Sequence, residues 1–487
     1  MAKCKRSGRP PQAQHNGKSQ PSQHDKRQRL ATRNPQRQST RQASVPLIGG
    51  VAVLADAMSR VLDQRIAFRL PIMLAGAMLA GGRRTAASWF RFAGVKDDWD
   101  RFYELLQTIG KNAASLMVPL LSFVLTKFDP GEHGYWTLMI DDSPTKRFGP
   151  CVEAANIHHN PTPGPGDGEW LYGHNWVCLA LALGHPLFGV IALPLRSLLY
   201  VRRVGIETLQ ARYDWKFRTK HELALDLCQR AMSMLRAMGS QAGFVIVFDG
   251  AYAAKSLVRP LIAQGATVVT HIRRDAKLFD LPVNKTGQRG RPRKYGKHRI
   301  SLTKRAGHRD GWETISYLCR GVMTEGRCKT FLATNHLVGG VVRVVLLKHA
   351  SGNWAAYISS DTSMTAEAIL KIVSDRWSIE EHFHDVKEIW GAGEQQVRNV
   401  WSSIGCWHVC GWLYALVELE SWDEPSESLV DRSDRPWDNP DRRPSHNDRR
   451  RRIARKMLHE AFLIDLPDAP ENTKFRHRIE RLLALAV

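Results

Sequence analysis

Two short stretches decide the fold: residues 136–142 read WTLMIDD, and residues 244–249 read FVIVFD. Each is an apolar run of strand length that leads directly into an acidic residue. Because functional groups of sheet proteins gather at the carboxyl ends of strands, we expect Asp141 and Asp249 to lie at one edge of a sheet. Asp142 is the alternative to Asp141, since the two aspartates are adjacent.

The segments that follow these strands complete a mixed α/β pattern. A hairpin is expected from strands at 176–183 and 189–195, then a helix at 219–238, a helix near 255–263 and a strand at 266–272. The order strand, strand, strand, helix, strand, helix, strand is that of a ribonuclease H-like fold, in which helices cover a mixed sheet. The sequence therefore predicts an α/β protein with a ribonuclease H-like core.

Composition divides the rest of the chain into flanking and inserted parts. The N-terminal segment is basic and lacks aromatic residues, which predicts disorder, and the segment after it carries apolar residues at helical spacing. The expected parts are a disordered basic arm (1–45), a helical DNA-binding domain (46–130), the first part of the core (131–272), a β-rich insertion (273–360), a catalytic helix with the end of the core (361–420), and a linker with basic C-terminal helices (421–487).

The charge balance indicates a polyanionic partner. Lysine and arginine number 70 against 47 acidic residues, a formal net charge of +23. Neutralised phosphates release condensed counterions, so double-stranded DNA is the first expectation. A membrane surface is the rival, but the most apolar stretch, Val177 to Leu183, is shorter than a bilayer span. With no apolar signal core near the N-terminus, we expect a cytoplasmic protein associated with the bacterial nucleoid.

A third acidic residue is expected on a helix that begins after Thr365 and continues through Lys387. Arg376, Glu380 and Lys387 are four and then seven positions apart, so they would share one helical face. Glu380 would bind metal, while Arg376 and Lys387 would hold phosphate or orient the acid. The ordinary alternative is an exposed pair between Arg376 and Glu380, worth about 0.2–0.5 kcal/mol.

Three convergent carboxylates suit one kind of chemistry. Phosphodiester cleavage by two divalent ions needs acidic residues from different elements that together hold the ions. Oxygen ligands without cysteine suit Mg²⁺ or Mn²⁺. Asp141, Asp249 and Glu380, with Asp142 as the alternative to Asp141, are therefore the candidate catalytic and metal-binding residues.

The same residues carry a resemblance to a known family. Arg376, Glu380 and Lys387 match a Y-x2-R-x3-E-x6-K signature at full spacing, although Val373 stands in place of the tyrosine. The chain thus resembles insertion-sequence transposases of the DDE class. Similar segments are the D-x-S setting at 141–143, the run around the second aspartate at 248–252, and 172–176 and 193–202.

The resemblance implies an enzyme that cuts DNA at the ends of an insertion element and transfers the freed 3′-hydroxyl into target DNA. It also implies at least a homodimer, because two DNA ends must be brought together. Two alternatives stay open: a metal-dependent nuclease or resolvase of the same fold, and a non-catalytic DNA-binding regulator derived from a transposase.

Two basic segments are expected to contact DNA. The loop at 289–294 resembles a minor-groove hook, in which arginines flank a glycine-proline turn. Arg83 and Arg84 would open a helix with side chains that reach phosphates. The hook residues expected to bind DNA are Arg289, Arg291, Arg293 and Lys294.

Overall fold

The computed structural model describes residues 40–463 and a few residues between 473 and 482. Gaps in that range fall at 131–133, 161–162, 165–167, 284–290, 350–351 and 433–436. Contacts divide the chain between Ser39 and Thr40, and the fold below is that of the second unit. The basic arm predicted over 1–45 lies almost wholly outside the described residues, as does most of the terminal helix expected beyond residue 473.

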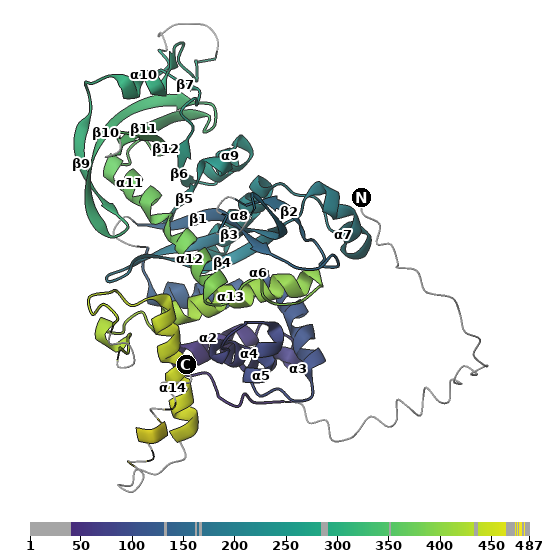
Figure 1. Ribbon diagram of the computed structural model, residues 1–487. Helices are drawn as coiled ribbons and strands as arrows, with labels where there is room; N and C mark the ends of the chain where they lie inside the picture. Colours follow the sequence, from purple (N-terminus) through teal and green to yellow (C-terminus); the bar gives the residue numbers. More distant parts are fainter. Residues whose placement is uncertain are drawn as a thin grey trace. The chain divides into compact units, whose positions relative to one another are not determined.

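A mixed sheet forms the centre of the molecule (Figure 1). Its core strands lie in the order β4-β3-β1-β5-β6, with β3 antiparallel to β1 and β4, while β5 and β6 run parallel to β1. Parallel neighbours need crossover helices, and α8 (Lys220–Ala237) and α9 (Lys255–Ala263) supply them. The strands are β1 (Tyr135–Lys146), β2 (Asn156–His159), β3 (Trp170–His185), β4 (Gly189–Tyr200), β5 (Gly243–Phe248) and β6 (Ala266–Ile272).

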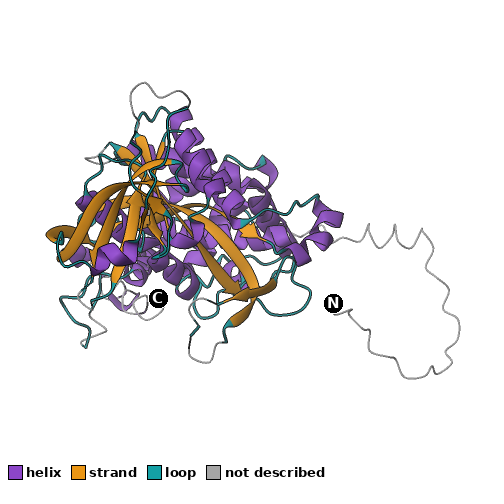
Figure 2. Ribbon diagram, turned by 90° about the horizontal axis from the view of Figure 1, so that it is seen from above, coloured by secondary structure: helices purple, strands orange, loops and turns teal. Residues whose placement is uncertain are grey.

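The insertion is β-rich, as predicted, and it extends the same sheet. Strand β12 pairs antiparallel with β6, with Ser359 opposite Val269, so the insertion continues the core sheet beyond its edge. A second apolar cluster, which includes Val344 and Ile358, packs inside this part. Figure 2 shows the strands in orange with the helices packed along them. The elements are β7 (Leu278–Phe279), β8 (Arg299–Ile300), α10 (Leu302–Gly307), β9 (Glu313–Cys319), β10 (Val322–Asn335), β11 (Gly340–Lys348) and β12 (Trp354–Ser359).

Helices cover both faces of the core sheet. On one face, α8 packs against β3 and β4, and α9 packs against β6. Helix α8 begins with a capping box between Thr219 and Glu222, which satisfies amides at its first turn. On the other face lie α11 (Ala366–Asp375), α12 (Ser378–Glu388) and α13 (Val400–Glu420). Short helical elements are α7 (Ile206–Tyr213), η1 (Arg203–Gly205), η2 (Gly250–Tyr252) and η3 (Ser426–Ser428).

The single late helix predicted from Thr365 to Lys387 is two helices. Thr365 does cap the first, because its hydroxyl accepts from the Ala368 amide at 3.2 Å. The chain then tightens at Arg376 and Trp377, where amides bond carbonyls three residues back: Trp377 N to Ser374 O and Ile379 N to Arg376 O, both 3.1 Å. Arg376 therefore lies in the joint, and the expectation of one continuous helix is wrong, although Arg376 still contacts Glu380.

The N-terminal region is helical, as predicted, but its helices share one apolar core with the sheet. Helix α6 packs along α13 (Figure 1). The two backbones come close at Gly110 and Gly405, where an added Cβ would collide with the Trp401 and Leu106 carbonyls respectively. The helices are α2 (Gly49–Ser59), α3 (Gln64–Ala67), α4 (Arg69–Leu79), α5 (Ala86–Phe92) and α6 (Trp99–Lys127).

Two of the described helices, α6 and α13, are long and apolar enough to cross a bilayer by length and composition. The short run Val177–Leu183 therefore did not reveal these two longer apolar segments. In α13, 89% of the apolar window is buried inside the protein, and in α6 44% is buried. Since the two helices pack on each other, their apolar character is explained by the core they share.

The basic helix predicted near Arg449 is α14 (His446–Leu463), and part of its charge is buried. Glu418 of α13 is fully buried, accepts from His446 Nδ1 at 2.5 Å and pairs with Arg449. Arg450 is also buried and donates to the Met78 carbonyl at 3.0 Å. The run of arginines thus joins α14 to α13 and α4, in addition to carrying charge.

Candidate active site

The sequence predicted Asp141 at the end of its strand, but Asp141 lies within β1. The strand continues to Lys146 because its second half still pairs with β3, with Asp141 opposite Cys178. Its parallel pairing with β5 stops at Ile140 opposite Phe248. Asp141 and Asp249 therefore both follow the last pair of the β1–β5 ladder, which places the two acids side by side.

The two adjacent aspartates of β1 point to opposite faces of the sheet, as alternation along a strand requires. The Asp142 carboxylate accepts from the Tyr252 hydroxyl at 2.9 Å and from Lys220 Nζ at 2.7 Å. Asp141 accepts from Arg376 Nη1 at 2.6 Å and from the Asp142 amide at 2.8 Å. Only Asp141 faces the helices that carry the third predicted acid.

Arg376 joins the first and third acids. Its Nη2 donates to Glu380 Oε1 at 3.1 Å while Nη1 holds Asp141. The side chains of Arg376 and Asp141 are 16% and 17% exposed, and that of Glu380 is 36% exposed. An exposed pair within one helix, the ordinary alternative, does not describe this arrangement, because the guanidinium bridges two elements that are far apart in the sequence.

Asp249 is held at the end of β5 by its own backbone turn. Its Oδ1 accepts from the Ala251 amide at 2.9 Å and so caps η2. The pKa of Asp141 is raised to about 7, chiefly by burial; Arg376 opposes this rise, and the negative charge of Asp249 adds to it. A carboxyl with such a pKa beside a second carboxylate is a frequent feature of functional sites.

His271 belongs to the same surroundings and was missed from the sequence. It lies in β6, beside the turn after Asp249. Burial lowers its pKa, as does the charge of Arg376, while Asp249 acts in the opposite direction. A polar residue inside the otherwise apolar run 266–272 was the signal that could have found it.

The donor chemistry of the three acids fits divalent ions such as Mg²⁺ or Mn²⁺. All three supply carboxylate oxygens, the ligands that these ions prefer in proteins. Among the residues that the structure describes, no group of three or more His, Cys, Asp or Glu is arranged to hold a metal ion. Arg376 provides the positive charge between Asp141 and Glu380 in this arrangement.

The other predicted site residues are placed less centrally. Lys387 of α12 is largely buried, and burial lowers its pKa. Arg83 is exposed, whereas the Arg84 amide donates to Glu394 at 2.6 Å and burial lowers the pKa of its guanidinium. In the loop at 289–294, Arg289 lies outside the described residues, and the exposed members are Arg291, Arg293 and Lys294. Their contacts with DNA stay a prediction.

Comparison with protein families identifies the family of the chain. The family described as "DDE superfamily endonuclease" matches residues 57–321, more than half of the chain. The protein belongs to this family. The matched segment contains both aspartates of β1 and Asp249, and it ends before Arg376 and Glu380, so two of the three candidate acids lie inside it.

Comparisons with other proteins give distant likenesses. A piggyBac transposase in a synaptic complex with hairpin DNA is 10% identical with a TM-score of 0.35, over 94% of this chain and 80% of that chain. The NurA nuclease from Sulfolobus solfataricus is 10% identical with a TM-score of 0.22, over 57% of this chain and 85% of that chain. No curated protein matches this DDE endonuclease.

Proposed function

We propose that this DDE endonuclease is a DNA transposase of the insertion-sequence type with the Y-R-E-K signature. It would cut DNA at the ends of its element and transfer the 3′-hydroxyl into target DNA. The observation that carries the proposal is the bridge from Asp141 through Arg376 to Glu380, beside Asp249. The resemblance to transposases pointed to Asp141, Arg376 and Glu380, and in the structure Arg376 contacts both acids.

Each residue of this edge has a role that follows from its contacts. Asp141, Asp249 and Glu380 would hold two divalent ions, Mg²⁺ or Mn²⁺, which when bound stabilise the charge that develops during phosphodiester cleavage. Arg376 neutralises two of these carboxylates, and its planar guanidinium also suits a phosphate once the acids have another cation. Asp142 fixes β1 from the opposite face through Tyr252 and Lys220.

The fold and the charge support the same proposal. The strand order β4-β3-β1-β5-β6, with three antiparallel and then parallel strands, is the one expected of a ribonuclease H-like core. A net charge of +23 suits double-stranded DNA as the partner, and Arg83 and the exposed part of the loop at 289–294 are the candidate contacts. We further propose a helical DNA-binding region before β1, a cytoplasmic location and a homodimer that joins two element ends.

A strand-transfer assay tests the proposal. The substrates are DNA from the inverted repeats that flank the coding region, intact and with a pre-cut 3′-end, with Mg²⁺ or Mn²⁺ and a target plasmid. We expect cleavage of the first and joining of the second, and neither with Asp249→Asn. Cleavage without joined product would favour a nuclease or resolvase. Sequence-specific binding without cleavage would favour a regulator.

A further inference from the structure

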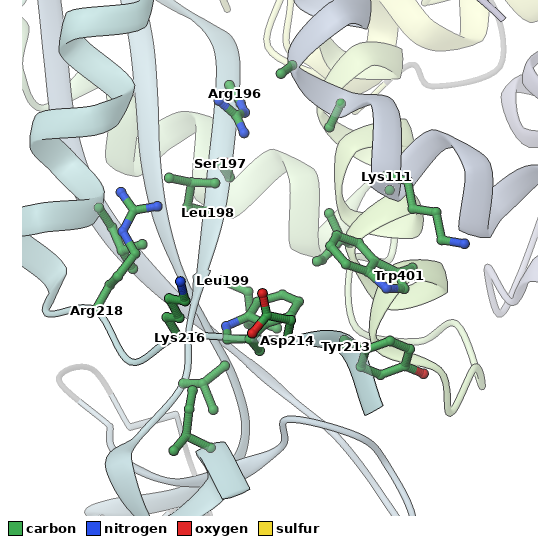
Figure 3. A pocket seen from close by; sticks show the side chains of 18 residues that line it. Lys111, Arg196, Ser197, Leu198, Leu199, Tyr213, Asp214, Lys216, Arg218 and Trp401 are labelled. Carbon is green, nitrogen blue, oxygen red and sulfur yellow. The ribbon is translucent and has the colours of Figure 1, made fainter. Parts of the chain in front are cut away.

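A charged pocket lies beside β4, the strand next to β3 in the core sheet, and Figure 3 shows side chains that line it. It has a volume of about 480 Å³ and lies between α6, β4, the segment from α7 to α8, and the start of α13. Arg196 of β4 lines it, and this residue pairs with Leu179, next to the partner of Asp141 on β3. The pocket is therefore two strands away from the candidate active site, at about 10 Å between backbones for an ordinary strand spacing.

Arg196 is the first reason to expect a ligand there. Its Nε and Nη1 atoms are buried, and neither has a hydrogen-bond partner among the residues that the structure describes. The nearby carboxylate of Asp226 is engaged by Arg230 at 2.7 Å and by Arg218 at 3.3 Å. Burial lowers the pKa of Arg196, and the charges of Arg230 and Arg218 lower it as well, while Asp226 opposes them. Buried guanidinium nitrogens without a partner are costly for a fold, so such a group is commonly completed by an anion.

The other side chains of the pocket define the ligand further. Lys111 and Lys216 add positive charge beside Arg218, which is paired with Asp226, and Asp214 is the carboxylate of the lining (Figure 3). Trp215 and Trp401 are half-buried, with ring centroids 5.2 Å apart, so they offer aromatic surface beside the cations. Asp214 adopts a left-handed backbone conformation at φ 52°, which holds a hydrogen-bond acceptor in the same wall.

We infer that this pocket binds a nucleotide, with the phosphate at Arg196 and the base against Trp215 and Trp401. An anion alone explains the guanidinium but leaves the aromatic wall unused, and an apolar ligand leaves Arg196 unpaired. A base stacks on aromatic side chains whatever its sequence, and Asp214 can accept from an exocyclic amino group. The volume is in the range of pockets that enclose small molecules. The inference goes beyond the proposed function, since it does not involve the three acids.

Titration calorimetry in EDTA tests the inference, because the acids then hold no divalent ion. The probes are dAMP, inorganic phosphate, deoxyadenosine and a five-nucleotide single strand. We expect dAMP to bind at least about tenfold more tightly than phosphate or deoxyadenosine, since each fragment keeps only part of the contacts. Tighter binding of the oligonucleotide than of dAMP would identify a DNA strand as the source, and the reverse would identify a free nucleotide.

Substitution of Arg196 separates a ligand site from a structural arginine. Arg196→Met is expected to weaken dAMP binding by about tenfold or more, while the melting temperature stays unchanged or rises, because an unpaired buried charge is removed. Arg60→Met is the matched control, since the Arg60 side chain is 79% exposed and lies outside the pocket. Unchanged dAMP affinity in Arg196→Met, or equal affinity for dAMP and phosphate, would overturn the inference. Neither result depends on whether strand transfer occurs.

Discussion

The two faces of β1 treat adjacent aspartates in opposite ways. Both carboxylate oxygens of Asp142 accept hydrogen bonds, one from Tyr252 and one from Lys220. Asp141 is buried beside Asp249, has a pKa of about 7 and is held by an arginine that it shares with Glu380. The difference teaches that one aspartate, Asp142, stabilises the fold through its hydrogen bonds. The other, Asp141, is buried beside a second acid, where a bound cation would stabilise its charge.

The largest expected effect separates the two aspartates by activity. Asp141→Asn should reduce DNA cleavage by about three orders of magnitude or more, because it removes a catalytic carboxylate. Asp142→Asn should reduce cleavage less than about tenfold, since an asparagine can still accept from the Tyr252 hydroxyl. Cleavage rates on the same DNA ends measure both. A larger loss for Asp142→Asn would reverse the assignment of the two faces.

Breaking the bridge on the Asp141 face should have the next largest effect. Arg376→Gln is expected to lower cleavage by about a hundredfold, because it removes a cation that contacts two of the acids. Arg376→Lys keeps the charge without the two-pronged geometry and should recover only part of the rate. If the Arg376→Gln variant cleaved DNA at the normal rate, the role of Arg376 would be structural only. The melting temperature of the variant would then be lowered.

On the other face, the expected effect is on stability. Asp142→Ala should lower the free energy of unfolding by about 1–3 kcal/mol, since it leaves the buried Tyr252 hydroxyl without its acceptor. Tyr252→Phe, which removes the hydroxyl itself, should cost less, about 1 kcal/mol. Denaturant titration compares the two variants. An unchanged unfolding midpoint in Asp142→Ala would contradict the structural role of that face.

The smallest effect is a pH dependence of stability. The pKa of Asp141 is raised from its ordinary 3.8 to about 7, so the folded state binds more protons than the unfolded state between these values. Stability from this residue is therefore full at low pH and is lost as pH rises through that window. Asp141→Asn should raise the melting temperature by a few degrees at pH 8 and by less at pH 5. An equal rise at both values would show that burial of the Asp141 charge is not the cause.

Local patterns in the sequence were sufficient for most elements of the core. Apolar runs located β1, β5 and β6, and the order of strands and helices indicated the mixed sheet. Thr365 caps a helix as expected, and the helix expected at 219–238 is α8. The bend at Arg376 was not visible, because residues 365–387 carry helical spacing throughout and no glycine or proline marks a break.

By itself, the sequence determined that acidic residues follow two apolar strands, at Asp141 and Asp249. The spacing of a later helical segment pointed to Glu380. Only the tertiary structure decided that Asp141 and Asp142 face opposite sides, because the side of a sheet that receives helices depends on how the whole chain folds back. The tertiary structure likewise decided the contact of Arg376 with Asp141 and the surroundings of Arg196 among the described residues. Those are contacts between segments far apart in the chain, which local periodicity does not encode.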